Sequence, residues 1–273
     1  MPDATTLMLR SPLTEPIEAD GITADRVAGL SEIEVARLPV WCGRQRLPLG
    51  DLFAVRGGRS RQIRITGDVR HVAGIGTGMT SGDLVIDGHV GANLGAGMTG
   101  GRIEVLGSAG DSAGQAMAGG VLIVRGSAGN RVGAGAPGSS RGMSGGEIVI
   151  EGSVGADAGA RMRRGLLFIG GDAGDTIARA IIAGTVIVLG QIGPQPALGS
   201  KRGTLVAVGG VNIPVTYRYA CTYEPPHVRV ALVYVRRRFN LTIPPEVVGG
   251  RYRRYCGDAG TVGKGEILAW TSA

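Results

Sequence analysis

The residues of this chain that could carry out catalysis or bind metal are few and widely separated. The cysteines and histidines number three each: Cys42, Cys221, Cys256, His71, His89 and His227. Zinc and iron–sulfur sites need closely spaced ligands, and a disulfide framework needs an even number of cysteines, so the spacing argues against all of these. No Ser/His/Asp or Cys/His arrangement follows from the sequence either. We therefore predict no catalytic residue, no metal ligand and no cofactor bound by catalytic residues of this chain.

Two features look like chemical sites in composition only. Residues Gly74 to Gly78 read Gly-Ile-Gly-Thr-Gly, but they lack the lysine and hydroxyl of a P-loop and belong to a repeated corner. A lone histidine such as His71 or His89 could be the base of an acyltransferase built from hexapeptide repeats. The repeat of this chain is 19 residues long, however, and three hexapeptides do not make that length.

The basic residues give a clearer signal. Lysine and arginine together number 29 against 22 acidic residues, which leaves a net charge of +7. Arg163 and Lys201 share one repeat position two units apart, as do Arg164 and Arg202, and we call these four residues the basic corner. Stacked units would place each pair ~10 Å apart, which suits a polyanion or an acidic protein surface; a solvated corner is the alternative. Nucleic acid is not expected, because no aromatic-interleaved motif accompanies the charges.

A repeat of 19 residues positions these side chains. Its anchor glycines follow one another at 19, 19, 26, 19, 19 and 19 residues: Gly82, Gly101, Gly120, Gly146, Gly165, Gly184 and Gly203. After each anchor, apolar residues alternate, as in Leu84/Ile86 and Ile103/Val105, which is the period of a strand. Glycine recurs too often for a helix, where each costs ~1 kcal/mol. We predict a short strand, a glycine-rich bend and a second, weaker strand in each unit.

A short fixed period with ladders of equivalent residues is typical of stacked coils. Three residues before the anchors, one ladder holds Met79, Met98, Met117, Met143, Met162 and then Ile181. We interpret it as thioether packing in the core, because no Cys or His joins it to make a metal site. The predicted fold class is all-β: a parallel β-helix of about seven to eight 19-residue coils with terminal caps. The longer fourth unit predicts a loop within residues 133–142.

The strand residues of opposite parity form an outer row. All but Glu104 are apolar, so the sheet is expected to be covered on both faces. The cover could be the chain's own terminal segments or another subunit. We favour a subunit for at least part of it, because a long apolar stripe on a rigid rod is typical of an interface. The predicted interface residues are Val85, Ile123, Val149, Phe168, Ile187 and Val206.

The two ends of the chain lack the repeat. We predict an N-terminal capping segment over 1–60, the glycine-rich β-helix over 61–209 and a C-terminal capping or docking segment over 210–273. Within the last, Val228 to Val235 is predicted to be a strand. The first 20 residues contain Asp3, Glu15 and Glu18 and no long apolar run, so we expect no secretory signal, no membrane span and a cytoplasmic location.

Several glycine-rich phrases resemble a known family. They are Gly76-Thr77-Gly78-Met79-Thr80-Ser81-Gly82, Gly95-Ala96-Gly97-Met98-Thr99-Gly100-Gly101 and Arg141-Gly142-Met143-Ser144-Gly145-Gly146. They resemble the repeat domain of the C subunit of formylmethanofuran dehydrogenase and, less closely, the C-terminal domain of the glutamate synthase large subunit. The first resemblance extends over nearly the whole chain, from Leu38-Pro39-Val40 to Arg254-Tyr255-Cys256-Gly257-Asp258.

The resemblance implies a right-handed β-helix that is a noncatalytic structural subunit of a larger enzyme complex in one-carbon metabolism. In archaea the family serves molybdenum or tungsten formylmethanofuran dehydrogenases. In methylotrophic bacteria a related subunit belongs to the formyltransferase/hydrolase complex, which moves a formyl group from a tetrahydromethanopterin carrier through a methanofuran-type carrier to formate. The arginine-rich composition favours the bacterial complex.

In either complex the resemblance places the catalytic residues in other subunits, so none is carried over to this chain. The implied partners are amidohydrolase-like, formyltransferase and further subunits. Methanofuran-type carriers have glutamate-rich tails, so we predict that the basic corner faces such a tail or an acidic partner subunit.

Two other functions stay open at this point. One is an independent solenoid enzyme, such as an acyltransferase or a glutamate-synthase-like domain. The other is a free-standing module that binds anionic polymers. Stable co-purification with other subunits would favour the scaffold. An active homotrimer would favour the acyltransferase, and a monomer that binds polyanions with strong salt dependence would favour the binding module.

Overall fold

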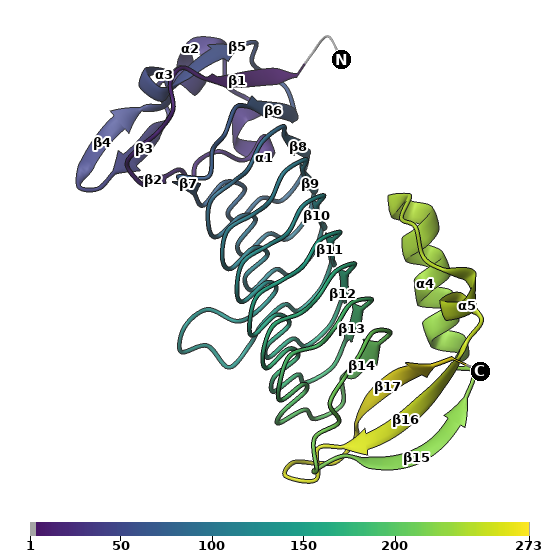
Figure 1. The fold of residues 1–273 in the computed structure, drawn as a ribbon. Helices are drawn as coiled ribbons and strands as arrows, with labels where there is room; N and C mark the ends of the chain where they lie inside the picture. The colour runs from purple at the N-terminus through teal and green to yellow at the C-terminus, as the bar shows by residue number, and fades with distance from the viewer. Residues whose placement is uncertain (1–3, 273) are drawn as a thin grey trace.

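The computed structural model describes residues 4–272, and strands dominate it (Figure 1). The larger of two sheets in this part of the chain has 13 strands. Eight of them come one from each successive unit and run in parallel: β6 (Gln62–Thr66), β8 (Asp83–Ile86), β9 (Arg102–Val105), β10 (Val121–Val124), β11 (Glu147–Ile150), β12 (Leu166–Ile169), β13 (Thr185–Val188) and β14 (Thr204–Ala207). Equivalent residues lie opposite each other, as Leu84 does Ile103 and Leu122 does Ile148. The repeat therefore fixes the register of the sheet.

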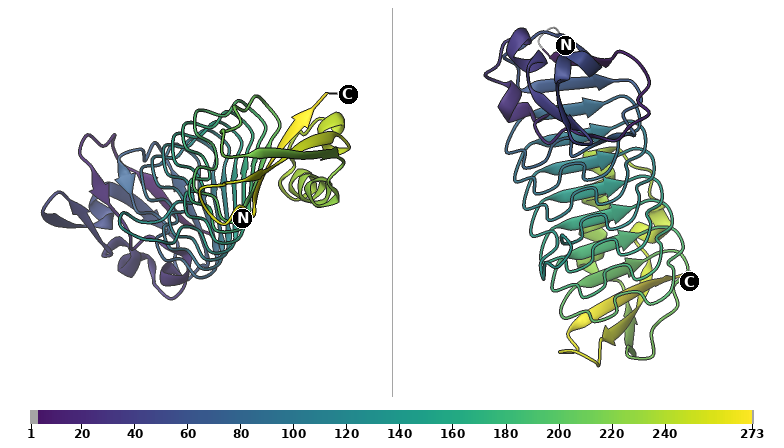
Figure 2. Two further views of the ribbon diagram at one scale, coloured as in Figure 1. Left: turned by 90° about the horizontal axis from the view of Figure 1, so that it is seen from below. Right: turned by 90° about the vertical axis from the view of Figure 1, so that its left-hand side faces the viewer.

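Single β-bridges connect successive units on the side away from these strands. The bridge residues are Val69, Val90, Ala109, Ala128, Val154, Ala173 and Ile192. The sequence predicted a second, weaker strand in each unit, but the structure pairs only one residue there. The reason is that the backbone turns to positive φ three residues later, as at Asn93 and Asp157 (both φ 59°). Extended pairing does not continue through a left-handed residue. The right-hand view of Figure 2 shows the resulting coils stacked one above another, with their turns in front of the strands.

Apolar ladders fill the interior of the stack. Strand residues such as Leu84 and Ile103 are fully buried, and every member of the methionine ladder is at most 1% exposed. Each methionine methyl lies where the anchor glycine of the next unit would carry a Cβ: Met98 Cε is 2.6 Å from that position at Gly120. The methionines are therefore core residues, and their packing depends on glycine at the facing anchor.

The N-terminal segment covers the first coil. Strand β1 (Thr5–Leu9) pairs in parallel with β6 and antiparallel with β5 (Phe53–Arg56). A second sheet has the order β4-β3-β2-β7, formed by β2 (Ile17–Glu18), β3 (Pro39–Cys42), β4 (Gln45–Pro48) and β7 (Val72–Ala73). Three short helices lie between these strands: α1 (Ala24–Val27), α2 (Glu32–Ala36) and α3 (Leu49–Leu52). Leu7, Leu49 and Phe53 are fully buried and join the core of the stack.

The C-terminal segment extends the sheet at the other end. Strand β17 (Gly265–Thr271) pairs in parallel with β14, and then antiparallel with β16 (Arg251–Gly257), which pairs antiparallel with β15 (Arg218–Tyr223). Between β15 and β16 lie the helices α4 (Pro226–Phe239) and α5 (Pro245–Val248). Figure 1 shows α4 standing beside the stack, and its buried residues pack on the outer face of the sheet from β10 to β14.

The strand predicted at Val228–Val235 is wrong, because these residues belong to α4. A nearly continuous run of apolar, largely β-branched residues suggested an extended segment, but Val228, Leu232, Val235 and Phe239 also have helical spacing, and these four are the buried ones. Pro226 begins the helix, and Asn240 ends it in the left-handed conformation (φ 55°). The helix prevails because one apolar face can then pack against the outer row of the sheet.

The longer fourth unit forms a loop, as the sequence predicted. Within residues 133–142, residues 136–141 leave the stack, and Figure 1 shows the loop on the side away from α4. The loop rejoins the coils where the Gly142 N–H donates to the carbonyl of Arg161 at 2.8 Å. In the part of the chain that the structure describes, no helix has both the length and the apolar character needed to cross a membrane.

Candidate interaction surfaces

The structure does not gather the candidate chemical residues into one place. His71 and His89 are exposed, and His227 Nε2 lies 3.8 Å from Glu266 Oε1 on the other side of the molecule. All three cysteines are free. Among residues 4–272, no cluster of three or more His, Cys, Asp or Glu side chains could hold a metal ion.

His89 has a structural role in a ladder of polar side chains. Its Nδ1 accepts a hydrogen bond from the backbone N–H of Ser108 in the next unit at 3.1 Å. The Ser108 hydroxyl accepts in turn from Ser127 N–H, the Ser127 hydroxyl from Ser153 N–H, and the Ser153 hydroxyl from Asp172 N–H, at 3.2, 3.1 and 3.0 Å. Each side chain thus satisfies a donor that the corner would leave unpaired. This contact accounts for His89 without a catalytic function.

The basic corner is exposed and lies along one edge of the stack. The N–H groups of Arg163, Ile182 and Lys201 each donate to the preceding unit, to the carbonyls of Met143, Met162 and Ile181, at 2.7, 2.8 and 2.8 Å. Arg163 and Lys201 therefore hold equivalent positions on alternate coils, as the sequence predicted. All four residues of the corner are exposed, and none of them forms an ion pair with another described residue.

The chain itself covers most of the outer row. Ile123, Val149, Phe168, Ile187 and Val206 are at most 2% exposed and share one apolar cluster with the inner face of α4. Tyr252 of β16, Val247 of α5, Ile243 and Leu268 also belong to the cluster. This corrects the expectation of a partner subunit for these five residues: α4 already occupies the position, so another chain cannot reach them while the helix is in place.

Val85, the sixth predicted interface residue, remains accessible. It lies in a groove of about 510 Å³ that runs over β1, β6, β8 and β9, beyond the end of α4. Charged side chains border the groove, and several are paired within the chain: Arg64 with Asp87 and Arg102 with Glu104, both at 2.8 Å.

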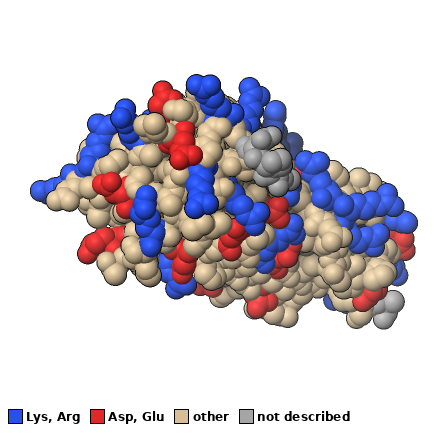
Figure 3. All heavy atoms as spheres, turned by 90° about the horizontal axis from the view of Figure 1, so that it is seen from above, with Lys and Arg blue, Asp and Glu red and all other residues tan. Residues whose placement is uncertain are grey.

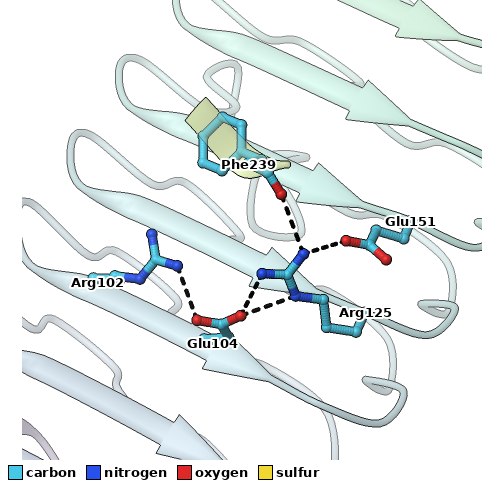
Figure 4. Close-up of polar contacts among 5 residues, drawn as sticks. All are labelled: Arg102, Glu104, Arg125, Glu151 and Phe239. Atoms are coloured by element: carbon cyan, nitrogen blue, oxygen red, sulfur yellow. Dashed lines mark hydrogen bonds and ion pairs between the residues drawn. The ribbon is translucent and has the colours of Figure 1, made fainter. Parts of the chain in front are cut away.

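A charged network joins the sheet to the end of α4 (Figure 4). Arg125 contacts Glu104 (Nη2 to Oε1, 2.6 Å) and Glu151, and its Nη1 lies 3.4 Å from the carbonyl oxygen of Phe239. Phe239 is the last residue of α4, so the guanidinium interacts with the negative end of the helix dipole. Arg102 contacts the other oxygen of Glu104.

The network keeps the Glu104 carboxylate ionised. Burial raises the pKa of Glu104, but hydrogen bonds from Arg102 and Arg125 outweigh it and hold the pKa below its usual range. Burial likewise lowers the pKa of the Arg125 guanidinium, and its contacts with Glu151 and Glu104 raise it by more. Glu104, the single polar residue of the outer row, is therefore a partner of Arg125 and not a break in the pattern.

This network was not among the residues predicted from sequence, although the sequence contains a signal for it. Arg125 and Glu151 share one repeat position on adjacent units, four residues after the first strand residue of each. Opposite charges at equivalent positions of stacked coils lie one strand spacing apart, about 4.8 Å.

Comparisons with known proteins agree with one another over different parts of the chain. No family model matches. The C subunit of molybdenum-containing formylmethanofuran dehydrogenase 1 from Methanothermobacter marburgensis is 40% identical over 87 residues, 31% of this chain and 22% of that protein. The C subunit of the formyltransferase/hydrolase complex Fhc of Methylorubrum extorquens is 36% identical over 87 residues, 32% of this chain and 33% of its own length. These sequence matches thus span about a fifth to a third of the curated relatives.

A match between structures covers nearly the whole chain. It is to a chain in the crystal structure of the formyltransferase/hydrolase complex (FhcABCD) from Methylorubrum extorquens in complex with methylofuran, with a TM-score of 0.88 and 33% identity. The match covers 98% of this chain and 100% of that one. The identity to the curated relatives and the structural match over nearly the whole chain lead to one conclusion: the chain belongs to the family of the C subunits of formylmethanofuran dehydrogenases and formyltransferase/hydrolase complexes.

Proposed function

We propose that this chain is a noncatalytic structural subunit of a formyltransferase/hydrolase complex in one-carbon metabolism. The observation that carries the proposal is the match to a chain of FhcABCD over 98% of this chain and 100% of the other, at 33% identity. The candidate chemical residues also lie apart from one another, and His89 is used in the polar ladder. The partners are then amidohydrolase-like, formyltransferase and further subunits, which hold the catalytic residues.

Purification from the native organism tests this function. The protein, tagged at its own locus, is expected to elute in a complex of fixed stoichiometry with amidohydrolase-like and formyltransferase subunits. The purified complex is expected to hydrolyse a formylated methanofuran-type carrier. Removal of the chain is expected to dissociate the catalytic subunits. A chain that elutes alone, or a complex that stays assembled and active without it, contradicts the proposal.

We further infer that the coils form a right-handed parallel β-helix. The residue-for-residue parallel register of eight strands and the line of bridges on the opposite side support this fold. We propose the same division as from sequence: a capping segment over 1–60, the β-helix over 61–209, and a capping and docking segment over 210–273. An experimental map of the assembled complex tests both the hand and the boundaries.

For the basic corner, we propose that it holds the glutamate-rich tail of a methanofuran-type carrier. The four side chains are exposed, and the two basic residues at each repeat position stand two coils apart, a separation of about 10 Å. An extended polyglutamate chain can reach several such charges at once. Exposed ion pairs contribute about 0.5 kcal/mol each, so the four together correspond to about 2 kcal/mol, or roughly 30-fold in affinity.

The test is binding of a polyglutamate peptide to the purified complex. Replacing Arg163, Arg164, Lys201 and Arg202 with glutamine is expected to weaken binding by roughly 30-fold at low salt. The matched control replaces Arg44, Arg46, Arg56 and Arg61 with glutamine. These residues are exposed, and their replacement removes the same charge at the far end of the molecule. Equal losses in both variants would indicate a net-charge effect, and unchanged binding in the first would exclude the corner.

Val85 is the part of the predicted interface that a partner can still contact. We propose that the groove around it receives a partner subunit, because the face of the sheet beyond α4 stays uncovered there. Replacing Val85 with glutamate is expected to weaken assembly without changing the Tm of the isolated chain by more than about 2 °C.

A further inference from the structure

Helix α4 has two apolar faces, and the fold uses only one. The inner face, formed by Val228, Leu232, Val235 and Phe239, is at most 3% exposed against the sheet. The outer face carries Val230, Val233 and Tyr234, of which Val230 is 67% exposed and Tyr234 38%. These three residues lie together with Arg229, Arg237 and Arg238 around one shallow hollow. We call this outer surface the α4 ridge.

The charge on the ridge is entirely of one sign. Helix α4 contains Arg229, Arg236, Arg237 and Arg238 and no acidic residue. Of the four, only Arg238 pairs with a carboxylate of the described chain, Glu147 on β11, at 3.1 Å. Figure 3 shows basic side chains gathered at the right-hand end of the molecule, the side on which α4 and the C-terminal strands lie in Figure 1. The ridge is thus an apolar strip with a basic rim, in which Arg229 and Arg237 have no ion-pair partner among the described residues.

Polar contacts hold the ridge in one orientation. Glu147 accepts hydrogen bonds from Tyr234 and Arg238, and Arg125 reaches the carbonyl of Phe239 at the end of the helix. The inner face is anchored in a well-packed cluster under the whole length of the helix. A partner would therefore meet a preformed surface and would not have to order it, which favours binding.

We propose that the α4 ridge docks a protein partner whose surface has an apolar centre and a rim of aspartate and glutamate. The apolar strip needs an apolar counterpart, which a polyglutamate chain lacks. A second copy of this chain fits poorly, because in a two-fold contact the ridge would face its own arginines in a molecule of net charge +7. A membrane surface fits poorly as well, since interfacial helices bury Trp, Phe or Leu, and the exposed face here offers valine and tyrosine.

This proposal rests on the proposed function, and it names the surface by which the subunit joins its complex. Arginine and tyrosine are the residue types that interfaces favour as energetic centres. Charge complementarity at the rim would set the rate and specificity of assembly, and the apolar strip would supply the desolvated centre.

The experiment measures assembly of the full-length chain with the purified partner subunits of its complex. Arg229→Glu/Arg237→Glu is expected to weaken assembly by roughly 10- to 100-fold, because rim charges become repulsive. Val230→Gln/Val233→Gln removes the apolar strip without changing charge and is expected to weaken it by at least about 10-fold. The matched control, Arg44→Glu/Arg46→Glu, makes the same charge change at the β3–β4 hairpin and is expected to assemble like the wild type. Circular dichroism confirms that each variant keeps its fold.

A compensating change identifies the partner surface. A partner subunit whose acidic rim residues are replaced with arginine is expected to assemble with the Arg229→Glu/Arg237→Glu chain but not with the wild-type chain. Assembly of both ridge variants at wild-type affinity would overturn the ridge and leave the subunit function intact. A wild-type chain that assembles with no subunit would overturn both. Loss of polyglutamate or anionic-vesicle binding with assembly unchanged would replace the protein partner by a polyanion or a membrane.

Discussion

Replacing Gly120 with alanine tests the dependence of the methionine ladder on the anchor glycines. A Cβ at this position would lie 2.6 Å from Met98 Cε and 2.8 Å from the carbonyl oxygen of Gly101, on a backbone with φ +83°. The methionine can move, but the carbonyl belongs to the stacked backbone and cannot turn away. Left-handed strain of about 1 kcal/mol and overpacking of about 1–3 kcal/mol predict a total loss of about 2–4 kcal/mol.

The control is Gly97→Ala. Gly97 also has positive φ (+64°), but no atom lies within 4 Å of its added Cβ, so only the backbone strain remains. Thermal unfolding of the two variants, followed by circular dichroism, separates the two effects. For a chain of this size, 1 kcal/mol corresponds to about 2–4 °C in Tm. We expect a fall of about 2–4 °C for Gly97→Ala and of roughly 4–16 °C for Gly120→Ala.

Equal Tm losses at the two glycines would refute the steric argument. A second comparison identifies the methionine as a source of the clash. Met98→Ala alone is expected to cost about 2–5 kcal/mol through the cavity that it leaves. The double variant is expected to lose less stability than the sum of the two single losses, because the cavity left by Met98→Ala accepts the new methyl group. Strict additivity would show that Met98 does not limit the space at Gly120.

Three further predictions concern the outer face and the buried polar groups. Arg125→Gln leaves Glu104 and Glu151 without their shared cation and is expected to lower the free energy of unfolding by about 1–2 kcal/mol at pH 7. Because the pKa of Glu104 in the folded state lies below its ordinary 4.5, this stability is present above pH 4.5 and is lost on acidification below it. Urea unfolding at several pH values should show a smaller loss of stability with acid in the variant than in the wild type. Leu232→Ala, under α4, is expected to cost about 2–5 kcal/mol and to expose the outer row, which dye binding and limited proteolysis between β15 and β16 would detect; unchanged proteolysis would mean that α4 does not rely on this contact. Tyr217→Phe removes a hydrogen bond to the carbonyl of Ala197 (2.9 Å) and is expected to cost about 1 kcal/mol; burial raises the pKa of Tyr217 to about 12, so the wild type should lose stability as the pH rises from 10 to about 12, and calorimetry should find that alkaline loss reduced in the variant.

The repeat and its register could be predicted from sequence because every unit has residues of the same kind at the same positions. Leu84 and Ile103 occupy equivalent positions 19 residues apart, and in stacked parallel strands equivalence means contact. The inward side of the methionine ladder followed in the same way. The length of the weaker strand was overestimated, because the residue three positions after the bridge adopts positive φ even where it is Ser112, Arg131 or Thr176, residue types that do not indicate that conformation.

The ends of the chain escaped prediction for a different reason. Their structure depends on contacts that no repeat encodes. The segment from Val228 to Val235 is rich in valine, like a buried strand, yet it forms a helix because the outer row from Ile123 to Val206 offers an apolar surface for its inner face. The exposed state of the basic corner could be read from its charge alone. The network of Arg125 depends on the position of Phe239, which only the folded C-terminal segment defines.

The length of α4 limits how the number of coils can vary. Its 14 residues measure about 21 Å at 1.5 Å per residue, and the four spacings from β14 to β10 measure about 19 Å. The helix begins at the C-terminal strands and ends on Arg125 of the β10 unit, so it acts as a ruler laid along this part of the stack. Inserting or deleting one coil between β10 and β14 would shift Arg125 by about 5 Å relative to Phe239 and break the contact. A coil added between β6 and β9 leaves this distance unchanged, so the repeat can lengthen or shorten there while the C-terminal half keeps a fixed span.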